Sequence, residues 1–228
     1  GRNLEKLFDR LTAGYHDSID FNRLPIPFAC VATDIVDNSE YVMRGGVLSE
    51  AMRSSMAIPG VFSPVRKDSM VLVDGGLRNN FPVDIARQMG ADVVIGVTVQ
   101  EDLKEAYDLK STSDVLLQIV NINCKNKYDE NLAMTDVPVC VNTKGYSSAS
   151  FTAAAIDTLM RRGEEAAMRQ WDRLMEVKRE IGIDSTFVPV RPSLHPAAML
   201  PDTLSGTQTV RREGRFMAGL GVRFDTEE

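Results

Sequence analysis

The residues best suited to chemistry lie in Met70–Pro82, where four apolar residues run into an aspartate, two glycines and a polar turn closed by a proline. A carboxylate at the end of a buried strand can act as a base, and glycines beside it let another backbone approach closely. The pair Asp74-Gly75, flanked by apolar residues, is also a strong signal for a hairpin turn. Within this stretch the catalytic and hairpin interpretations are almost equally supported.

No convincing nucleophile accompanies this carboxylate. The chain holds no Gly-x-Ser-x-Gly motif, and its nearest match is GYSSA at 145–149. A nucleophile elbow places its serine directly on a strand-to-helix turn, whereas five residues separate Val141 from Ser147 here. We interpret Ser148 and Ser150 as residues that cap the following helix.

Residue types that other mechanisms need are scarce. His16 and His195 are the two histidines of the chain, so a Ser-His-Asp triad and a zinc site are both disfavoured. The three cysteines show no Cys-x-x-Cys spacing, and the glycine-rich loops that cradle phosphates are missing. We therefore predict no metal and no cofactor, and interpret Asp34, Asp37 and Glu40 as solvated turn residues.

The composition of the 228-residue chain excludes some classes of function. Hydrophobic residues make up 43% and charged residues 25% of the chain, as in an ordinary globular protein. A net charge of −6 argues against binding to nucleic acid, which requires clustered lysine and arginine. The chain begins at glycine instead of methionine, so we expect it to be a piece of a longer protein.

Hydrophobic patterns predict an alternation of strands and helices. We expect extended segments at 27–36, 41–44, 61–62, 70–73, 92–99 and 137–141, and helices at 47–56, 82–90, 114–120 and 151–181. The order strand, helix, strand over 70–99 implies a right-handed crossover and an α/β architecture. Apolar residues at steps of three and four in the last helix, including Ile156, Met160 and Trp171, are predicted to be core contacts.

These patterns divide the chain into three parts. Residues 1–188 hold the predicted α/β elements, and residues 189–207 form a linker that contains four prolines. Residues 208–228 form a tail in which apolar residues alternate from Phe216 to Phe224, which predicts one further strand.

An ordered series of motifs over about residues 1–185 resembles the patatin-like phospholipase family. The series includes SSMAIPGVFSPV at 54–65, VDGG at 73–76, NNFP at 79–82 and GAD at 90–92. The resemblance implies a three-layer α/β fold of which this chain is an incomplete C-terminal portion, with a mainly parallel sheet flanked by helices.

The resemblance also implies a mechanism. In that family a serine in a Gly-x-Ser-x-Gly elbow attacks lipid esters, and the aspartate of the Asp-Gly-Gly motif activates it without a histidine. The motif match makes Asp74 that aspartate, with Gly75, Gly76, Asn80 and Pro59 as supporting residues. Because the elbow and the oxyanion loop are missing, we expect the chain to carry only the Asp half of a Ser-Asp dyad and to be inactive alone. An aspartate is a poor base, so geometry and an oxyanion hole must supply most of the stabilisation, and the motif context favours the catalytic interpretation over the hairpin.

The implied function is a lipid acyl hydrolase, a phospholipase or esterase, that acts on a lipid or phospholipid ester at a membrane surface. The alternative is a non-catalytic binding or assembly module of an outer-membrane protein that retains the fold. Residues 219–225 resemble the opening strand of an outer-membrane barrel, although an edge strand or a tail is almost equally supported. On this basis we expect a bacterial outer-membrane or periplasmic location. We also expect homo-oligomers, because an incomplete sheet exposes apolar faces and an unpaired edge.

Overall fold

The computed structural model describes residues 2–100, 103–147, 150–183 and 186–188, in which helices and strands alternate along the chain. The strands are β1 (Ile19–Asp20), β2 (Cys30–Asp34), β3 (Ser39–Met43), β4 (Gly45–Gly46), β5 (Val65–Lys67), β6 (Met70–Asp74), β7 (Ile95–Thr98) and β8 (Val137–Cys140). The helices are α1 (Arg2–Leu11), α2 (Leu48–Ser55), α3 (Gly76–Asn79), α4 (Val83–Gln88), α5 (Thr112–Asn123), α6 (Tyr128–Ala133), α7 (Ala153–Met168) and α8 (Trp171–Glu180). The predicted α/β class is confirmed.

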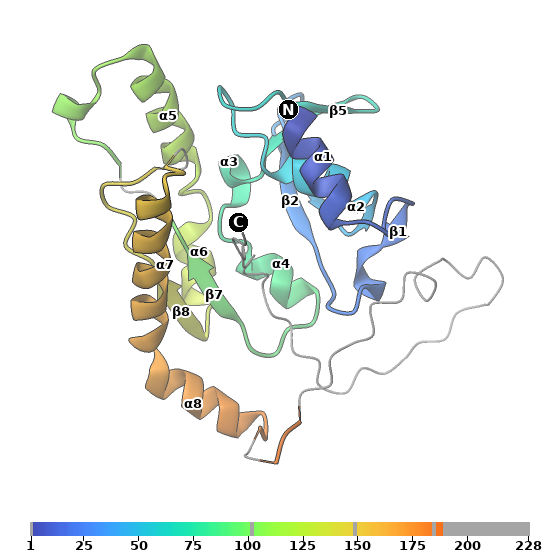
Figure 1. The fold of residues 1–228 in the computed structure, drawn as a ribbon, viewed down its shortest axis with the longest axis vertical. Helices are drawn as coiled ribbons and strands as arrows, with labels where there is room; N and C mark the ends of the chain where they lie inside the picture. Colours follow the sequence, from blue (N-terminus) through green and yellow to red (C-terminus); the bar gives the residue numbers. More distant parts are fainter. Residues whose placement is uncertain (1, 101–102, 148–149, 184–185, 189–228) are drawn as a thin grey trace.

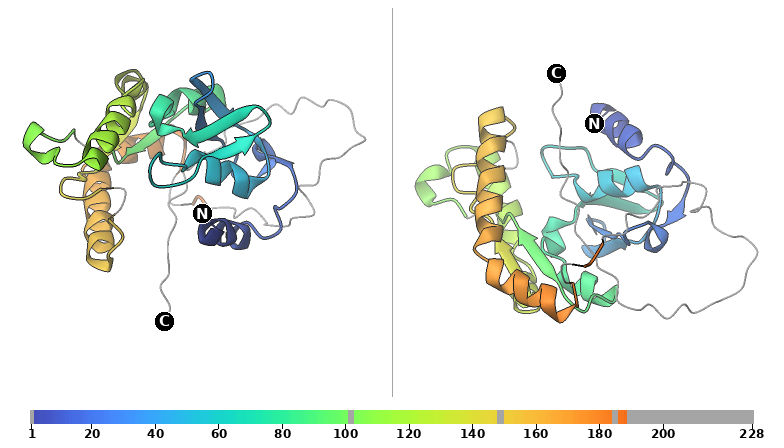
Figure 2. Two further views of the ribbon diagram at one scale, coloured as in Figure 1. Left: turned by 90° about the horizontal axis from the view of Figure 1, so that it is seen from above. Right: turned by 60° about the horizontal axis from the view of Figure 1, so that its bottom comes forward.

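The elements form two groups that lie side by side (Figure 1). One group holds β1 to β6 with α1 and α2, and the other holds β7 and β8 with α5 to α8. Helices α3 and α4 lie between them, and the two groups are again separate when the molecule is turned (Figure 2). The residues of α3 and α4 therefore decide how the groups are joined.

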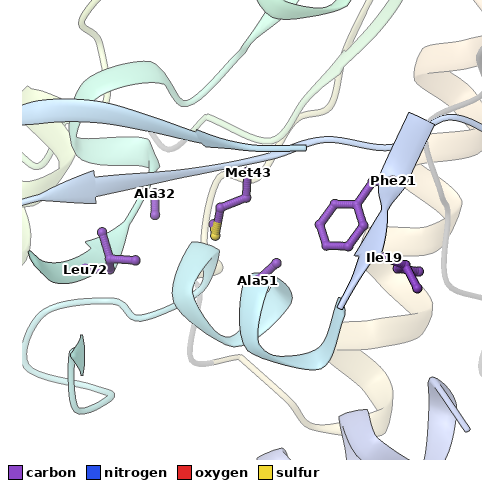
Figure 3. Close-up of a cluster of buried hydrophobic side chains, with 6 residues drawn as sticks. All are labelled: Ile19, Phe21, Ala32, Met43, Ala51 and Leu72. Carbon is purple, nitrogen blue, oxygen red and sulfur yellow. The ribbon is translucent and has the colours of Figure 1, made fainter. Parts of the chain in front are cut away.

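The first group is built on a four-stranded sheet in the order β3-β2-β6-β5, in which every neighbouring pair is antiparallel. One face of this sheet packs on α2 through a buried cluster of apolar side chains (Figure 3). The cluster comprises Ile19, Phe21, Ala32, Met43, Ala51 and Leu72. The predicted strand-turn-strand at 27–44 and the predicted helix at 47–56 are both found here.

The second group contains a parallel pair of strands, in which Ile95 of β7 lies opposite Val137 of β8. Their parallel pairing agrees with the predicted alternation of strand, helices and strand over 92–141. The expected crossover that would place β6 beside β7 is not formed. Strand β6 has no edge to offer, because β2 occupies one edge and β5 the other. The expected mainly parallel sheet therefore holds for β7 and β8 but not for the four-stranded sheet.

The helix expected over 151–181 is two helices, α7 and α8, that meet at Arg169 and Gln170. The N–H of Gln170 bonds to the carbonyl of Ala167, three residues back, which closes a tighter turn and ends α7. The apolar stripe is therefore not continuous. Ala166 and Val177 are buried against β8, whereas the predicted core residues Ile156, Met160 and Trp171 are exposed.

Smaller predictions also need correction. Val61 and Phe62 form a turn instead of an extended segment, because both backbone N–H groups donate to the carbonyl of Ile58. Thr152, and not Ser150, caps α7 by accepting a hydrogen bond from the N–H of Ala155 at 3.3 Å. Ser148 lies outside the described residues, as do the linker at 189–207 and the tail at 208–228.

Two of the turn carboxylates are also less solvated than expected. Asp34 is buried and accepts hydrogen bonds from the N–H groups of Val36 and Val71 at 3.0 and 3.1 Å. Glu40 accepts a hydrogen bond from the ammonium group of Lys127 at 2.9 Å. No helix in the described part of the chain is long and apolar enough to cross a membrane.

A closed ring of hydrogen bonds joins the two groups through α3, α4 and α6. The amide of Asn131 donates to Asn79 Oδ1 at 3.0 Å, and the amide of Asn79 donates to Asp84 Oδ1 at 2.8 Å. The backbone N–H of Asp84 donates to Asn131 Oδ1 at 3.0 Å and closes the ring. Asn79 and Asn131 are only 2% and 1% exposed, so water cannot replace a lost partner.

We expect Asn131→Ala to lower the free energy of unfolding by about 2 to 4 kcal/mol, because it leaves Asn79 Oδ1 and the N–H of Asp84 buried without partners. Urea denaturation of the 228-residue chain measures this. Asn123→Ala is the matched control, since Asn123 is exposed on α5. A loss no larger than that of the control would contradict the role given to the ring.

Candidate active site

The sheet ends at a half-buried carboxylate. Leu72 and Val73 of β6 are buried in the core, and Asp74 is the last residue of the strand. The chain then enters α3 directly, with Gly75 at helical φ and ψ of −65° and −21°. The hairpin interpretation of Asp74-Gly75 is therefore wrong, and β6 makes its hairpin with β5 at the other end of the strand.

Space, and not backbone conformation, explains the two glycines. A Cβ atom on Gly75 would collide with the carbonyl oxygen of Val31 in β2. A Cβ atom on Gly76 would lie 2.7 Å from Asn80 Oδ1 and 3.0 Å from Asp74 Oδ1. Since both φ values lie outside the left-handed region, any larger residue would push α3 away from the sheet and displace the carboxylate.

The end of α2 and the loop after it fix the backbone of Asp74 and Gly75. The N–H of Asp74 donates to the carbonyl of Ala57 at 3.1 Å, and the N–H of Gly75 donates to the carbonyl of Ser55 at 3.3 Å. Pro59 lies in the same loop, two residues beyond Ala57. The supporting role of Pro59 stays a prediction.

Arg53 was not singled out from the sequence, yet it anchors this loop. Its guanidinium donates to the carbonyl of Ser63 at 2.7 Å and lies over the ring of Phe62, 5.5 Å from the centroid. Arg53 is buried although it is charged. The helical pattern gave no signal for this, because Arg53 lies off the apolar face of Leu48, Ala51 and Met52.

The Asp74 carboxylate has one strong backbone contact. Its Oδ1 accepts a hydrogen bond from the N–H of Gly76 at 2.7 Å. Burial raises the pKa of Asp74 above its ordinary value, and the hydrogen bond from Gly76 opposes this only in part. A raised pKa brings a carboxyl group closer to the range in which it can exchange protons near neutral pH.

Asn80 connects this carboxylate to the second group of elements. The amide oxygen of Asn80 and Asp74 Oδ1 approach the same point above Gly76. The amide nitrogen of Asn80 donates to Gln100 Oε1, just beyond β7, at 2.9 Å. The structure thus brings Asp74, Gly75, Gly76 and Asn80 together, and their catalytic roles stay predictions.

Two of the three side chains behind the site, those of Asp84 and Asn131, were not singled out from the sequence. Asn79, Asp84 and Asn131 hold α3 in place, although Asn131 lies 52 residues from its partner Asn79. Burial would raise the pKa of Asp84, but hydrogen bonds from Asn79 and Lys127 outweigh it, so the pKa lies below its ordinary value. Asp84 is therefore a structural anion, in contrast to Asp74.

Ser147 shows no features of an activated nucleophile. It is exposed, and its backbone N–H donates to Ser150 Oγ at 3.0 Å. Among the described residues, no serine hydroxyl is hydrogen bonded to the Asp74 carboxylate, and no group of three or more histidine, cysteine or acidic side chains could hold a metal ion.

Asp74→Asn should raise the free energy of unfolding at pH 7 and have little effect at pH 3.5. The pKa of Asp74 is higher in the folded than in the unfolded chain, so ionisation favours unfolding and stability falls as pH rises above about 3.9. Asparagine carries no charge and still accepts from Gly76. Urea denaturation at the two pH values measures the difference.

Asp37→Asn is the matched control for this pH dependence. Hydrogen bonds from Ser39 lower the pKa of Asp37, so the same substitution there should lower the free energy of unfolding at pH 7. A loss of stability at pH 7 for Asp74→Asn, equal to that at pH 3.5, would show that burial does not raise the pKa of Asp74.

Comparisons with known proteins agree with the sequence motifs. A sequence model of the patatin-like phospholipase family matches residues 1–87. The chain is 38% identical over 99 residues to an uncharacterized NTE family protein of Mycobacterium tuberculosis, a match that covers 43% of the chain and 16% of that relative. It is 38% identical over 93 residues to patatin-like phospholipase domain-containing protein 7 of Rattus norvegicus, covering 40% of the chain and 7% of the relative.

A third relative is a putative patatin-like phospholipase domain-containing protein of Caenorhabditis elegans, 40% identical over 76 residues that cover 32% of the chain and 7% of the relative. The matched segments thus span a small part of these longer proteins. The family match includes Asp74, Gly75, Gly76, Asn80 and Pro59. Over its first 87 residues the chain is thus similar to the patatin-like phospholipase family.

Proposed function

We propose that the protein containing this chain is a lipid acyl hydrolase in which Asp74 is the base of a Ser-Asp dyad. The observation that carries the proposal is a half-buried carboxylate with a raised pKa at the end of β6. It is followed by Gly75 and Gly76, two positions at which neighbouring atoms leave no room for a side chain. The names of the relatives support a phospholipid or related lipid ester as the substrate.

The chemistry assigns separate tasks to the two oxygens of Asp74. Because Oδ1 is engaged by the N–H of Gly76, Oδ2 is the atom available to accept a proton. The serine hydroxyl of the dyad, supplied by another part of the protein, adds to the ester carbonyl while its proton passes to Oδ2. When the tetrahedral intermediate collapses, the leaving alcohol takes that proton and an acyl-serine forms.

Water completes the reaction by the same route. It attacks the acyl-serine while Asp74 accepts its proton, the fatty acid departs, and the serine recovers its hydrogen. Since the aspartate is a weak base, the rate depends on the oxyanion hole as much as on Asp74. The raised pKa of Asp74 makes each proton transfer to it less unfavourable.

In the full-length protein, Asp74→Asn should lower the rate of hydrolysis of p-nitrophenyl butyrate and of phosphatidylcholine by about a thousandfold, because asparagine cannot accept the proton. Initial rates measure this. Asp37→Asn, at an exposed turn, is the control that should keep full activity. Retained activity in Asp74→Asn would refute the assignment and favour the alternative, a non-catalytic binding or assembly module with the same fold.

The isolated 228-residue chain serves as the negative control of the same assay. It holds no Gly-x-Ser-x-Gly motif, so we expect it to hydrolyse neither ester. If it did, and Ser147→Ala abolished the activity, then Ser147 would be the nucleophile and our interpretation of 145–149 would be wrong.

We also propose that the isolated chain self-associates through β7. One edge of this strand bonds to β8, and no strand in the described residues bonds to the other. Ile95, Val97 and Val99 alternate along this segment and expose apolar side chains on one face of it. Pairing between two such edges would cover both strands and their side chains.

Sedimentation at micromolar concentration should therefore show dimers or larger species, and Val97→Lys should shift the chain toward monomer. Met160→Lys is the control, because Met160 is 64% exposed against 59% for Val97 but lies on α7. A compact monomer of the unsubstituted chain would contradict the proposal.

The location of the whole protein is a separate proposal. We infer a bacterial outer-membrane or periplasmic location from the alternation between Phe216 and Phe224 in the sequence. Fractionation of cells that express the full-length protein tests it, and recovery in the cytoplasm would refute it while leaving the hydrolase proposal standing.

A further inference from the structure

A pocket of about 560 Å³ opens at the carboxyl ends of β7 and β8. Thr98 and Cys140, the last residues of the two strands, lie in its wall. Ligands of open α/β sheets bind beyond the carboxyl ends of parallel strands. The pocket is therefore in a position suited to a ligand, and it is distinct from the Asp74 carboxylate.

Two ammonium groups give the pocket a positive charge. Lys125 and Lys144 line it, and Asp129 is the one carboxylate among its lining residues. In the described part of the chain neither lysine makes an ion pair, whereas Lys67, Lys104 and Lys127 each do. A net positive pocket on a chain of net charge −6 favours an anionic ligand.

The segment that carries Lys144 is held in place from α7. The guanidinium of Arg162 donates to the carbonyls of Asn142 and Lys144 at 3.0 and 2.8 Å. It also lies over the ring of Tyr146, 5.1 Å from the centroid. Because the backbone is fixed at both carbonyls, the ammonium group of Lys144 need only rotate its own side chain to meet a ligand.

Neutral donors complete the lining. Thr98, Tyr128 and Gln100 face the pocket, and burial raises the pKa of Tyr128, so its hydroxyl keeps its proton at neutral pH. Ammonium groups combined with hydroxyl and amide donors are suited to the oxygens of a phosphate group. A phosphate monoester offers three terminal oxygens to these donors, whereas a phosphodiester and a carboxylate each offer two.

The pocket is joined to the candidate catalytic carboxylate through two side chains. Gln100 lines the pocket and accepts a hydrogen bond from Asn80 at 2.9 Å. Asn80 Oδ1 in turn lies beside Asp74 Oδ1 above Gly76. The side chains of Gln100 and Asn80 thus connect the pocket with the Asp74 carboxylate.

We propose that this pocket binds the phosphate group of a glycerophosphate ester, held by Lys125 and Lys144. Assigning it as the head-group site of a lipid substrate rests on the hydrolase function proposed above. The binding of the phosphate itself does not. The ligand can come from two sources that share this chemistry, a free phosphate ester or the head group of a lipid, and separate arms of one experiment distinguish them.

The first arm is calorimetric titration of the 228-residue chain with sn-glycerol 3-phosphate at constant ionic strength. We expect saturable binding with a dissociation constant of about 1 mM. Lys125→Gln and Lys144→Gln should each weaken it about tenfold, the usual loss of one charged hydrogen bond. Lys110→Gln and Lys178→Gln are controls with the same charge change at exposed positions outside the pocket, and they should bind as the unsubstituted chain does.

The second arm measures sedimentation with vesicles of phosphatidylglycerol and phosphatidylcholine. Vesicle binding that is weakened by the two pocket substitutions, and displaced by sn-glycerol 3-phosphate, supports a lipid head group as the source. Binding of the soluble ester without such vesicle binding supports a free phosphate ester. Both results support the phosphate site.

Two results would overturn the proposal. One is the lack of saturable binding of the soluble ester up to about 10 mM, where a millimolar site would be nearly filled. The other is equal weakening by the control substitutions, which would show a general effect of net charge. Neither arm measures hydrolysis, so failure of this proposal leaves the assignment of Asp74 untouched, and failure of the Asp74 assignment leaves the phosphate site standing.

Discussion

The buried ring of hydrogen bonds among Asn79, Asp84 and Asn131 is the interaction on which the rest of the structure depends. It ties α3 and α4, which lie between two groups of elements that share no sheet, to α6 of the second group. Helix α3 is only four residues long, so its own backbone hydrogen bonds cannot fix its direction. Each of the three side chains has its partner inside the ring, and the exclusion of water makes any other arrangement leave a polar group unpaired.

The position of Asp74 follows from this arrangement together with two steric limits. Contact between Gly75 and β2 brings α3 as close to the sheet as backbone atoms allow. The last residue of α2 and the loop after it accept hydrogen bonds from the backbone of Gly75 and Asp74. The carboxylate is thereby kept in surroundings that raise its pKa. A charge held partly out of water lowers stability, and its presence at the end of a well-packed strand is the pattern expected where function competes with stability.

What the sequence could predict depends on how far apart the interacting residues lie. Asp74, Gly75 and Gly76 are adjacent, so one motif contains both the carboxylate and the space it needs. The partner of Asn79 lies 52 residues away. The periodicity of hydrophobic residues does not indicate which two amide side chains will form a hydrogen bond. The missing β6–β7 pairing has a similar cause, because periodicity predicts strands but not which edge is already occupied. No proline or glycine lies beside the break at Gln170, and these are the residues that most strongly mark the end of a helix in a sequence.

The proposed arrangement connects two charges of like sign, the Asp74 carboxylate and the phosphate in the pocket. Asn80 and Gln100 lie between them, and their amide groups are hydrogen bonded to each other. Amides can turn a donor or an acceptor toward either side without carrying net charge, so they separate the two anions without attracting a competing ion. Burial raises the pKa of Asp74. An anion nearby would raise this pKa further, because it favours the protonated form of a carboxyl group. A bound phosphate would therefore make Asp74 a stronger proton acceptor, as a base that must take a proton from a serine requires.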